Sequence, residues 1–350
     1  WEAAHLVGQR YSAQGVPQGE VFAICSVTAD RYNLAVAYSP PSQSYLVVWR
    51  KGIWPDAVIR GQIVSADGTL LDNPSTPEDE SDPAVSFAIG DVGLGTQENP
   101  AIAYHTAADE YLVVWDDERN GNKDLYGRRI DADGFFLTDN LPLVTEPASQ
   151  REPALAYNET AGDYLLVWRD TRDQMGNRIY RLLLDTFGSP AGPEEAIAET
   201  LSESPAVAYN NAQNQYLVVW REGDSFLNIG DIGGRIVNAD GSPAAPPLSI
   251  CAGFGWEDRP RVAYNSTLHQ YLVLWEDTRN AVATRMDIYG RRVGGDGTLV
   301  EQGDFLVAGT PDDEGLSAVA YSGGSHQYLA VWQTCPVSYT HLTLPTKRIV

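Results

Sequence analysis

Tyr271-Leu-Val-Leu-Trp275-Glu-Asp-Thr-Arg279 is the stretch that decides the fold, because copies of it recur along the chain. Its Tyr-to-Trp core occurs six times, and successive Trp residues are 66, 53, 52, 55 and 57 positions apart. The copies span residues 45–49, 111–115, 164–168, 216–220, 271–275 and 328–332. A period of this size, built of short apolar runs, indicates a propeller or a solenoid.

Each repeat divides into four expected strands. Strand one has the pattern Pro-Ala-apolar-Ala-Tyr, as at residues 100–104, which places alternate side chains on opposite faces of a sheet. The Tyr-to-Trp segment is strand two, and strand three follows the pattern Asp287-Ile-Tyr-Gly-Arg-Arg-Val293. An Asp-Gly turn such as Asp240-Gly241 then leads to a short fourth strand, because Asp-Gly tolerates the positive φ angles of tight hairpins.

The repeat predicts an all-β chain, a β-propeller of four-stranded antiparallel blades. No segment has the period of an amphipathic helix, and neither a β-helix nor a sandwich repeats at this interval. We expect a single propeller domain over residues 1–335 with six blades. They are expected near residues 34–98, 100–150, 153–203, 205–258, 260–314, and 317–333 together with 1–25.

The sixth blade is expected to be composite and to be closed by the two ends of the chain. Leu6-Val7-Gly8-Gln9-Arg10 is similar to strand three, and residues 21–25 are similar to strand four. Residues 336–350 break the repeat and bring His, Thr and Lys into an acidic chain. Because this segment resembles the translation of a sequencing adapter, we expect it to be a non-native tail.

Charge excludes two classes of partner. The chain has 47 acidic and 24 basic residues, a formal net charge of -23. Such a field repels phosphate backbones and anionic lipid, so nucleic acid is not an expected partner. No apolar run approaches the roughly 20 residues that a membrane helix needs, so we expect no membrane insertion.

The sequence of residues 271–279, followed by that of residues 287–293, resembles a repeat of large secreted or surface proteins of bacteria. These proteins are generally treated as propeller repeats of unassigned activity, and the resemblance covers about residues 5–333. It implies a propeller fold and an extracellular or cell-surface location. It implies nothing about chemistry, and the sialidase, WD40 and kelch signatures are missing.

Cysteine and aspartate patterns give no metal motif. Cys25, Cys251 and Cys335 have no C-x-x-C spacing, and the first two occupy matching repeat positions, as small core residues would. Asp131-Ala-Asp133-Gly134 is the single approach to an integrin-like calcium loop, and we expect a plain hairpin turn there. The sequence therefore predicts no cofactor or metal, with calcium as the alternative.

An acid and an arginine follow the repeat Trp at a fixed spacing. The pairs are Asp117 with Arg119, Asp170 with Arg172, and Asp277 with Arg279. Carboxylate and guanidinium at this spacing can pair and fix the loop. Because the pair recurs, we interpret it as structural, since an active site needs unlike residues that converge once.

Residues that break the repeat are the better candidates for ligand binding. Trp256, Glu257, Asp258 and Arg259 are expected in a blade-connecting loop, where the indole could stack on a sugar ring and the polar groups could bind hydroxyls. Trp54 is a similar candidate in the first repeat. The alternative for each Trp is to cover the edge of a blade.

No Gly-x-Ser-x-Gly elbow, His-Glu-x-x-His motif or Walker loop is found, and the five His residues do not cluster. The sequence therefore favours a non-catalytic binding or scaffold propeller that recognises carbohydrate or protein through its loop face. One alternative is a glycan-active hydrolase or lyase with carboxylates in the central funnel, in which case the catalytic residues are unknown. Another is a purely structural array held partly by divalent cations.

Overall fold

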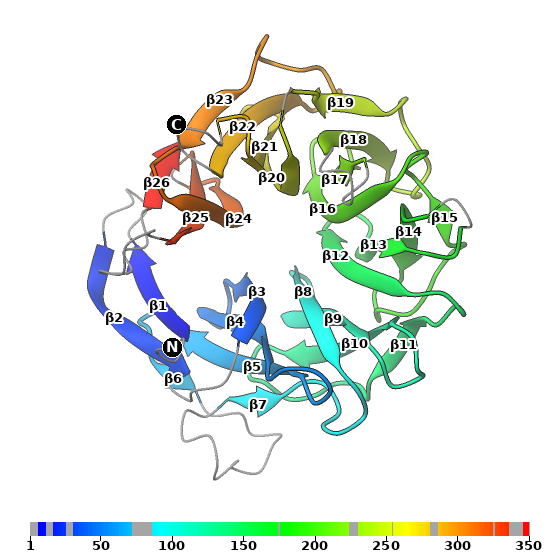
Figure 1. Ribbon diagram of the computed structural model, residues 1–350. Helices are drawn as coiled ribbons and strands as arrows, with labels where there is room; N and C mark the ends of the chain where they lie inside the picture. The colour runs from blue at the N-terminus through cyan, green and yellow to red at the C-terminus, as the bar shows by residue number, and fades with distance from the viewer. Residues whose placement is uncertain are drawn as a thin grey trace. The chain divides into compact units, whose positions relative to one another are not determined.

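A computed structural model describes residues 6–11, 17–25, 31–71, 86–173, 176–223, 230–253, 255–280, 286–324, 326–335 and 346–349. Within these ranges the regular secondary structure consists of β-strands (Figure 1). The search of the same ranges for a helix long and apolar enough to cross a membrane finds none. The chain divides into two compact units: unit 1 holds residues 1–12, 16–174 and 182–193, and unit 2 holds residues 13–15, 175–181 and 194–350.

Unit 1 begins with a two-stranded sheet, continues with the antiparallel sheets that we call blades 1 and 2, and includes the first two strands of blade 3. The first sheet contains β1 (Leu6–Tyr11) and β2 (Pro17–Cys25). Blade 1 contains β3 (Arg31–Ser39), β4 (Ser44–Lys51), β5 (Val58–Ser65), β6 (Leu70–Leu71) and β7 (Phe87–Ala88). Blade 2 contains β8 (Gln97–His105), β9 (Glu110–Asp117), β10 (Asp124–Asp131) and β11 (Leu141–Val144).

The strand order of blade 3 is β12 (Gln150–Asn158), β13 (Asp163–Asp170), β14 (Arg178–Leu184) and β15 (Glu195–Ala196). In unit 2, blade 4 contains β16 (Ser202–Asn210), β17 (Gln215–Glu222), β18 (Asp231–Asn238) and β19 (Leu248–Cys251). Blade 5 contains β20 (Glu257–Asn265), β21 (Gln270–Asp277), β22 (Asp287–Gly294) and β23 (Phe305–Ala308). The expected four-stranded antiparallel sheets, with strands in chain order, are confirmed.

The last sheet, which we call blade 6, has three strands in the described part of the chain. It contains β24 (Asp313–Ser322), β25 (Gln327–Cys335) and β26 (Thr346–Ile349). The register pairs Tyr328 with Ile349, so β26, from the segment expected to be a non-native tail, supplies the third strand. In the described part of the chain β1 pairs with β2. The closure of a composite blade by the two ends of the chain stays a prediction.

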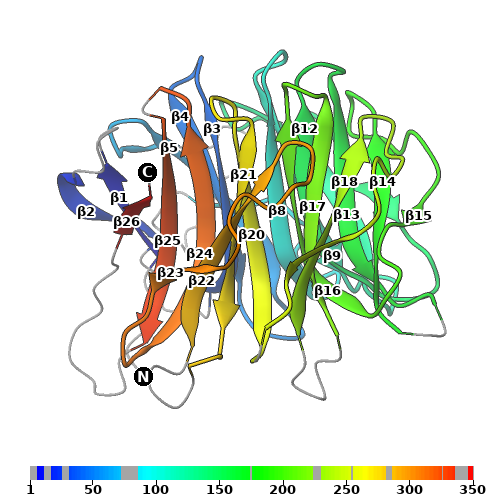
Figure 2. The ribbon, with the colours of Figure 1, turned by 90° about the horizontal axis from the view of Figure 1, so that it is seen from above.

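The Tyr-to-Trp strand of blades 2 to 5 is buried on both of its faces. In unit 2, Leu217 and Val219 of β17 pack in one cluster with Tyr271, Val273 and Trp275 of β21. Figure 2 shows β20 and β21 beside β24 and β25 in this unit. Since both faces of the strand contact apolar side chains, the segment is a continuous apolar run instead of an alternating one.

The first strand of a blade contains a bulge at a fixed place. In blades 2 to 5 the ladder shifts by one position, and the residue at the shift has a positive φ. These residues are Asn99, Glu152, Ser204 and Arg259, with φ of 50°, 55°, 52° and 48°. A proline follows each of them, and because proline has no N–H it cannot donate to the ladder.

His105, at the end of β8, is a buried histidine held in its neutral form. Its Nδ1 accepts from the Ala108 N–H at 3.1 Å, and its Nε2 lies 2.9 Å from Thr186 Oγ1. Burial lowers the pKa of His105, although Glu110 opposes this shift. Asn158, Asn210 and Asn265 hold the same position in the following blades and accept backbone N–H groups through Oδ1.

We therefore predict that His105→Asn changes how stability depends on pH. The unfolded chain binds a proton at His105 more readily than the folded chain, so the wild type should lose stability as pH falls below the ordinary histidine value of about 6.5. Thermal unfolding of both proteins from pH 7.5 to pH 5 measures this. The wild type should lose more stability than the variant, and parallel curves would contradict the prediction.

Candidate functional site

A buried indole, a carboxylate and a guanidinium form the recurring element at the end of strand two. Among the described blades, the Trp Nε1 donates to the acid two positions later in blades 2 to 5. The pairs are Trp115 with Asp117 at 3.1 Å, Trp168 with Asp170 at 2.8 Å, Trp220 with Glu222 at 3.0 Å and Trp275 with Asp277 at 3.0 Å. All four indoles are fully buried.

The arginine two residues after the acid completes this element in three blades. Nη2 to Oδ2 distances are 2.7 Å for Arg119 and Asp117, 2.7 Å for Arg172 and Asp170, and 2.5 Å for Arg279 and Asp277. In each of these blades the backbone N–H of the arginine also donates a hydrogen bond to the same carboxylate. The three carboxylates are fully buried, so these pairs position the loop and a ligand as large as a sugar cannot reach them.

The group around Trp256 does not lie in a loop as expected. Glu257, Asp258 and Arg259 belong to β20, because Glu257 pairs with Asp277 and Asp258 pairs with Glu276 in the ladder. Trp256 itself forms an isolated bridge with Gly230 and is partly buried, and its Nε1 has no hydrogen-bond partner among the described residues. A Cβ on Gly230 would lie 2.8 Å from Trp256 Cδ1, so the indole packs against the backbone just before β18.

The polar members of this group have separate environments. Asp258 Oδ1 accepts from Ser204 Oγ at 3.3 Å and lies 3.5 Å from Arg221 Nε. Arg259 is 60% exposed and its Nη1 lies 3.3 Å from Glu276 Oε2. Glu257 is fully buried. The structure thus does not gather the four predicted residues around one ligand position.

Trp54 has the opposite environment. It is 72% exposed in the turn between β4 and β5, next to Ile53, which is 59% exposed. Val92 and Leu94, in the loop before β8, are 73% and 50% exposed. The two loops are joined by a hydrogen bond of 3.1 Å from Thr96 Oγ1 to the Pro55 carbonyl. Of the two predicted Trp candidates, Trp54 is the one that a ligand can reach.

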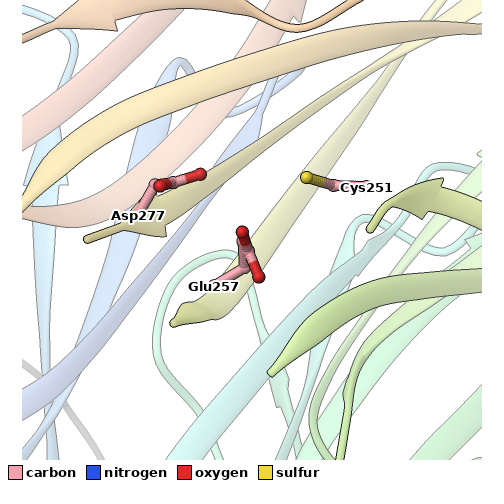
Figure 3. A group of neighbouring side chains, drawn as sticks. All are labelled: Cys251, Glu257 and Asp277. Atoms are coloured by element: carbon pink, nitrogen blue, oxygen red, sulfur yellow. The ribbon is translucent and has the colours of Figure 1, made fainter. Parts of the chain in front are cut away.

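A buried cluster in unit 2 gathers Cys251 from β19, Glu257 from β20 and Asp277 from β21. One ligand atom from each residue lies within 4.8 Å of the other two. In Figure 3 the Glu257 carboxylate is directed toward the space between Asp277 and the Cys251 sulfur. A thiol and two carboxylates so placed could hold a cation, which the sequence did not reveal because three strands of two blades contribute.

Glu257 is the unusual member of the cluster. Neither carboxylate oxygen has a hydrogen-bond partner in another described residue. Burial, with the nearby charges of Asp277 and Asp231, raises the pKa of Glu257 to about 7, while Arg279 acts in the opposite direction. A buried carboxylate without donors is costly unless it is neutralised, so a proton or a cation is required here.

Cys251, expected to be a small core residue, has polar neighbours. Its Sγ lies 3.3 Å from Asp304 Oδ2 and 3.3 Å from Arg279 Nη2. Burial and the Asp304 carboxylate raise the pKa of the thiol. Arg279 Nη2 and Arg291 Nη2 lie 2.9 and 2.8 Å from the Asp304 carboxylate.

A charged cluster of unit 1 provides a contrast. Lys123, which is 1% exposed, places its Nζ 2.8 Å from both Glu98 Oε2 and Asp116 Oδ1. Glu98 also pairs with Arg50. Each charge in this cluster has an opposite charge in contact, so the cluster needs no additional ion.

Residues 131–134, the segment for which calcium was the alternative, form a hairpin turn. Asp131 Oδ1 accepts the N–H groups of Asp133 at 3.1 Å and Phe135 at 2.8 Å, and the Gly134 N–H donates to the Asp131 carbonyl at 3.0 Å. This carboxylate oxygen is therefore engaged in organising the turn.

Comparison with known proteins identifies the fold. No family model and no curated protein matches the chain. A protein of unknown function from Dyadobacter fermentans DSM 18053 aligns over 90% of this chain and 93% of its own, with a TM-score of 0.60 and 13% identity. The microbial sialidase Hz136 aligns over 92% and 66%, with a TM-score of 0.55 and 11% identity. The GH93 α-L-arabinofuranosidase of Fusarium graminearum, in complex with arabinobiose, aligns over 74% and 77%, with a TM-score of 0.51 and 11% identity.

The four-stranded antiparallel sheets and these similar structures make the chain a β-propeller, as the repeat predicts. At identities of 11 to 13% the likeness concerns the fold alone.

The structural role of the acid–arginine element is tested by Asp170→Ala. The substitution leaves the buried Trp168 Nε1 and Arg172 without their acceptor, so we expect a loss of about 2–4 kcal/mol in the free energy of unfolding. Asp170→Asn keeps an acceptor for the indole and should cost less. The control Asp133→Ala, in an exposed turn, should change stability by at most about 0.5 kcal/mol. Equal urea unfolding curves for Asp170→Ala and the control would contradict the role.

Proposed function

We propose that this propeller is a non-catalytic binding module that recognises carbohydrate through the surface formed by Ile53, Trp54, Val92 and Leu94. The observation that carries the proposal is the exposed indole of Trp54, which follows exposed Ile53 in a loop that is hydrogen-bonded to the loop carrying exposed Val92 and Leu94. A gathering of exposed apolar side chains with a polar rim is typical of an interaction site. We call this set of four residues the Trp54 surface.

Backbone hydrogen bonds fix the two loops that carry the Trp54 surface. The Gln97 N–H donates to the Ala57 carbonyl at 2.9 Å, and the Asp56 N–H donates to the Ile53 carbonyl at 3.0 Å. Asp91, next to Val92, lies 3.0 Å from Arg119 Nη1. Hydrogen bonds that fix both loops reduce the ordering cost of binding, which favours affinity.

The chemistry of the surface favours a neutral sugar. An indole face offers apolar area with little conformational entropy to lose, and a sugar ring presents C–H groups of similar size. Exposed Asp56 and partly exposed Asp91 can accept hydrogen bonds from hydroxyl groups. The net charge of -23 disfavours anionic polysaccharides.

Two further observations are consistent with this proposal. Structures of similar fold include a sialidase and an arabinofuranosidase in complex with arabinobiose, so the fold accommodates proteins that act on sugars. The repeat resembles that of secreted and surface proteins of bacteria, which supports an extracellular or cell-surface location.

Glu257 and Asp277 are a close pair of carboxylates on which the hydrolase alternative can be examined. A retaining glycosidase uses two carboxyl groups about 5–5.5 Å apart, one of them with a raised pKa. Glu257 has such a pKa, and the two groups lie within 4.8 Å. Both side chains are fully buried, however, and Asp277 is engaged by Trp275 and Arg279. A sugar cannot reach this pair, so the geometry favours binding over catalysis.

The test is retention of the full chain on arabinan, xylan and β-glucan, with soluble products measured in parallel. Trp54→Ala should weaken binding by about 30-fold, the loss typical of a central aromatic contact. Trp256→Ala and Phe187→Ala, a partly buried and an exposed aromatic outside the surface, should bind as the wild type does. Unchanged binding by Trp54→Ala would overturn the proposed surface. Release of sugars would favour the hydrolase, and the absence of binding to any glycan would favour a protein ligand.

A further inference from the structure

Two departures from the repeat coincide at the buried cluster of blades 4 and 5. The fourth-strand position of Cys251 holds apolar Val144, Ala198 and Ala308 in blades 2, 3 and 5, and a cysteine again only at Cys25 of β2 among the described strands compared. The position of Glu257 holds Gln97, Gln150 and Ser202, all neutral. Cys251 and Glu257 therefore add a thiol and a carboxylate beside the Asp277 that the repeat already supplies.

The neutral residues at the Glu257 position have hydrogen-bond partners. Gln97 Oε1 accepts the Ile59 N–H at 3.1 Å, and Ser202 Oγ accepts the Ile179 N–H at 3.1 Å. Gln150 Nε2 donates to the Ala148 carbonyl at 2.8 Å. Glu257 makes no such contact in the described part of the chain, although its side chain is 0% exposed. Its carboxylate is thus directed into the cluster without a donor to satisfy it.

Blade 6 shows that a glutamate alone does not make this arrangement. Glu314 holds the corresponding position there, since its N–H donates to the Met286 carbonyl as the Glu257 N–H donates to Gly230. Its Oε1 accepts from the Thr310 N–H, and the residue opposite in the ladder is Thr334, not an aspartate. A glutamate, an aspartate opposite it and a thiol occur together in the cluster of Glu257, Asp277 and Cys251.

The backbone at Gly253 lies close to the cluster. A Cβ on Gly253 would lie 3.0 Å from Glu257 Oε1 and 3.7 Å from Cys251 Sγ, so a side chain there would crowd both ligand atoms. The three ligand atoms lie within 4.8 Å of one another, and movements of about 1 Å bring them to the distances of a tetrahedral zinc site.

We propose that Cys251, Glu257 and Asp277 bind one divalent cation of the zinc class, with water as the fourth ligand. A sulfur ligand and a small ligand number favour Zn²⁺ over Ca²⁺, which takes six to eight oxygens. On binding, Cys251 releases its thiol proton to solvent and the thiolate forms the metal bond. The site is distinct from the Trp54 surface and does not rest on the proposed function.

Charge balance supports a divalent ion. With Cys251 as thiolate, the contacting groups are four anions, since Asp304 joins the three ligands, and two guanidinium groups, those of Arg279 and Arg291. A divalent cation neutralises this set. The ion would also link β19 of blade 4 to β20 and β21 of blade 5, so its expected effect is to fasten neighbouring blades of unit 2.

The experiment is zinc binding by the full chain after removal of metal with a chelator. Elemental analysis should find one Zn²⁺ per chain after dialysis, and competition with a chromophoric chelator gives the affinity. Glu257→Gln and Cys251→Ala install residues that the repeat holds in other blades, so both should fold. Each should weaken zinc binding by about 100-fold or more.

Cys25→Ala, at a buried cysteine outside the cluster, is the matched control and should bind zinc as the wild type does. Cobalt in place of zinc should give a thiolate charge-transfer band in the wild type and in Cys25→Ala but not in Cys251→Ala. Zinc should raise the melting temperature of the wild type and not that of Glu257→Gln. A folded wild type without bound zinc, or full zinc affinity in Glu257→Gln or Cys251→Ala, would overturn the proposal.

Discussion

In blades 2 to 5, the hydrogen bond from a buried Trp indole to the carboxylate two residues later is the interaction on which the end of strand two depends. It allows a large apolar side chain to fill the space between sheets while its one polar atom finds an acceptor. The carboxylate in turn is held by an arginine two residues later, as in Asp117 with Arg119. One short segment therefore fills the core, ends strand two and directs the following loop.

A repeated element of this kind makes its exceptions informative. Where a blade keeps a neutral residue beside the acid, as with Gln97 and Gln150, no second carboxylate is buried there and the amide makes a hydrogen bond to the backbone. Where blade 5 places Glu257 there, a fully buried carboxylate lacks a donor among the described residues. The same blade junction contributes Cys251, whose counterparts in blades 2, 3 and 5 are apolar. Two unrelated departures at one place indicate a ligand better than either does alone.

The sequence predicted the architecture well and the candidate sites poorly, for physical reasons. Trp spacing and Asp-Gly turns report local geometry, so the antiparallel blades and the acid–arginine spacing could be read directly. Exposure depends on the packing of distant segments, so nothing in the sequence distinguished the exposed Trp54 from the partly buried Trp256. The repeat pattern starts this strand at Pro260 and so places Glu257 in a loop, whereas β20 begins at Glu257. Comparison of aligned repeat positions would have revealed Cys251 and Glu257 together.

The central claim is that departures from the repeat, and not the repeat itself, create the metal site, and transplantation tests it most directly. Val144 and Gln150 occupy the positions of Cys251 and Glu257 next to Asp170, which corresponds to Asp277. The double variant Val144→Cys, Gln150→Glu should therefore bind two Zn²⁺ per chain where the wild type binds one, as measured by elemental analysis after dialysis. A folded double variant that binds no more zinc than the wild type would contradict the claim.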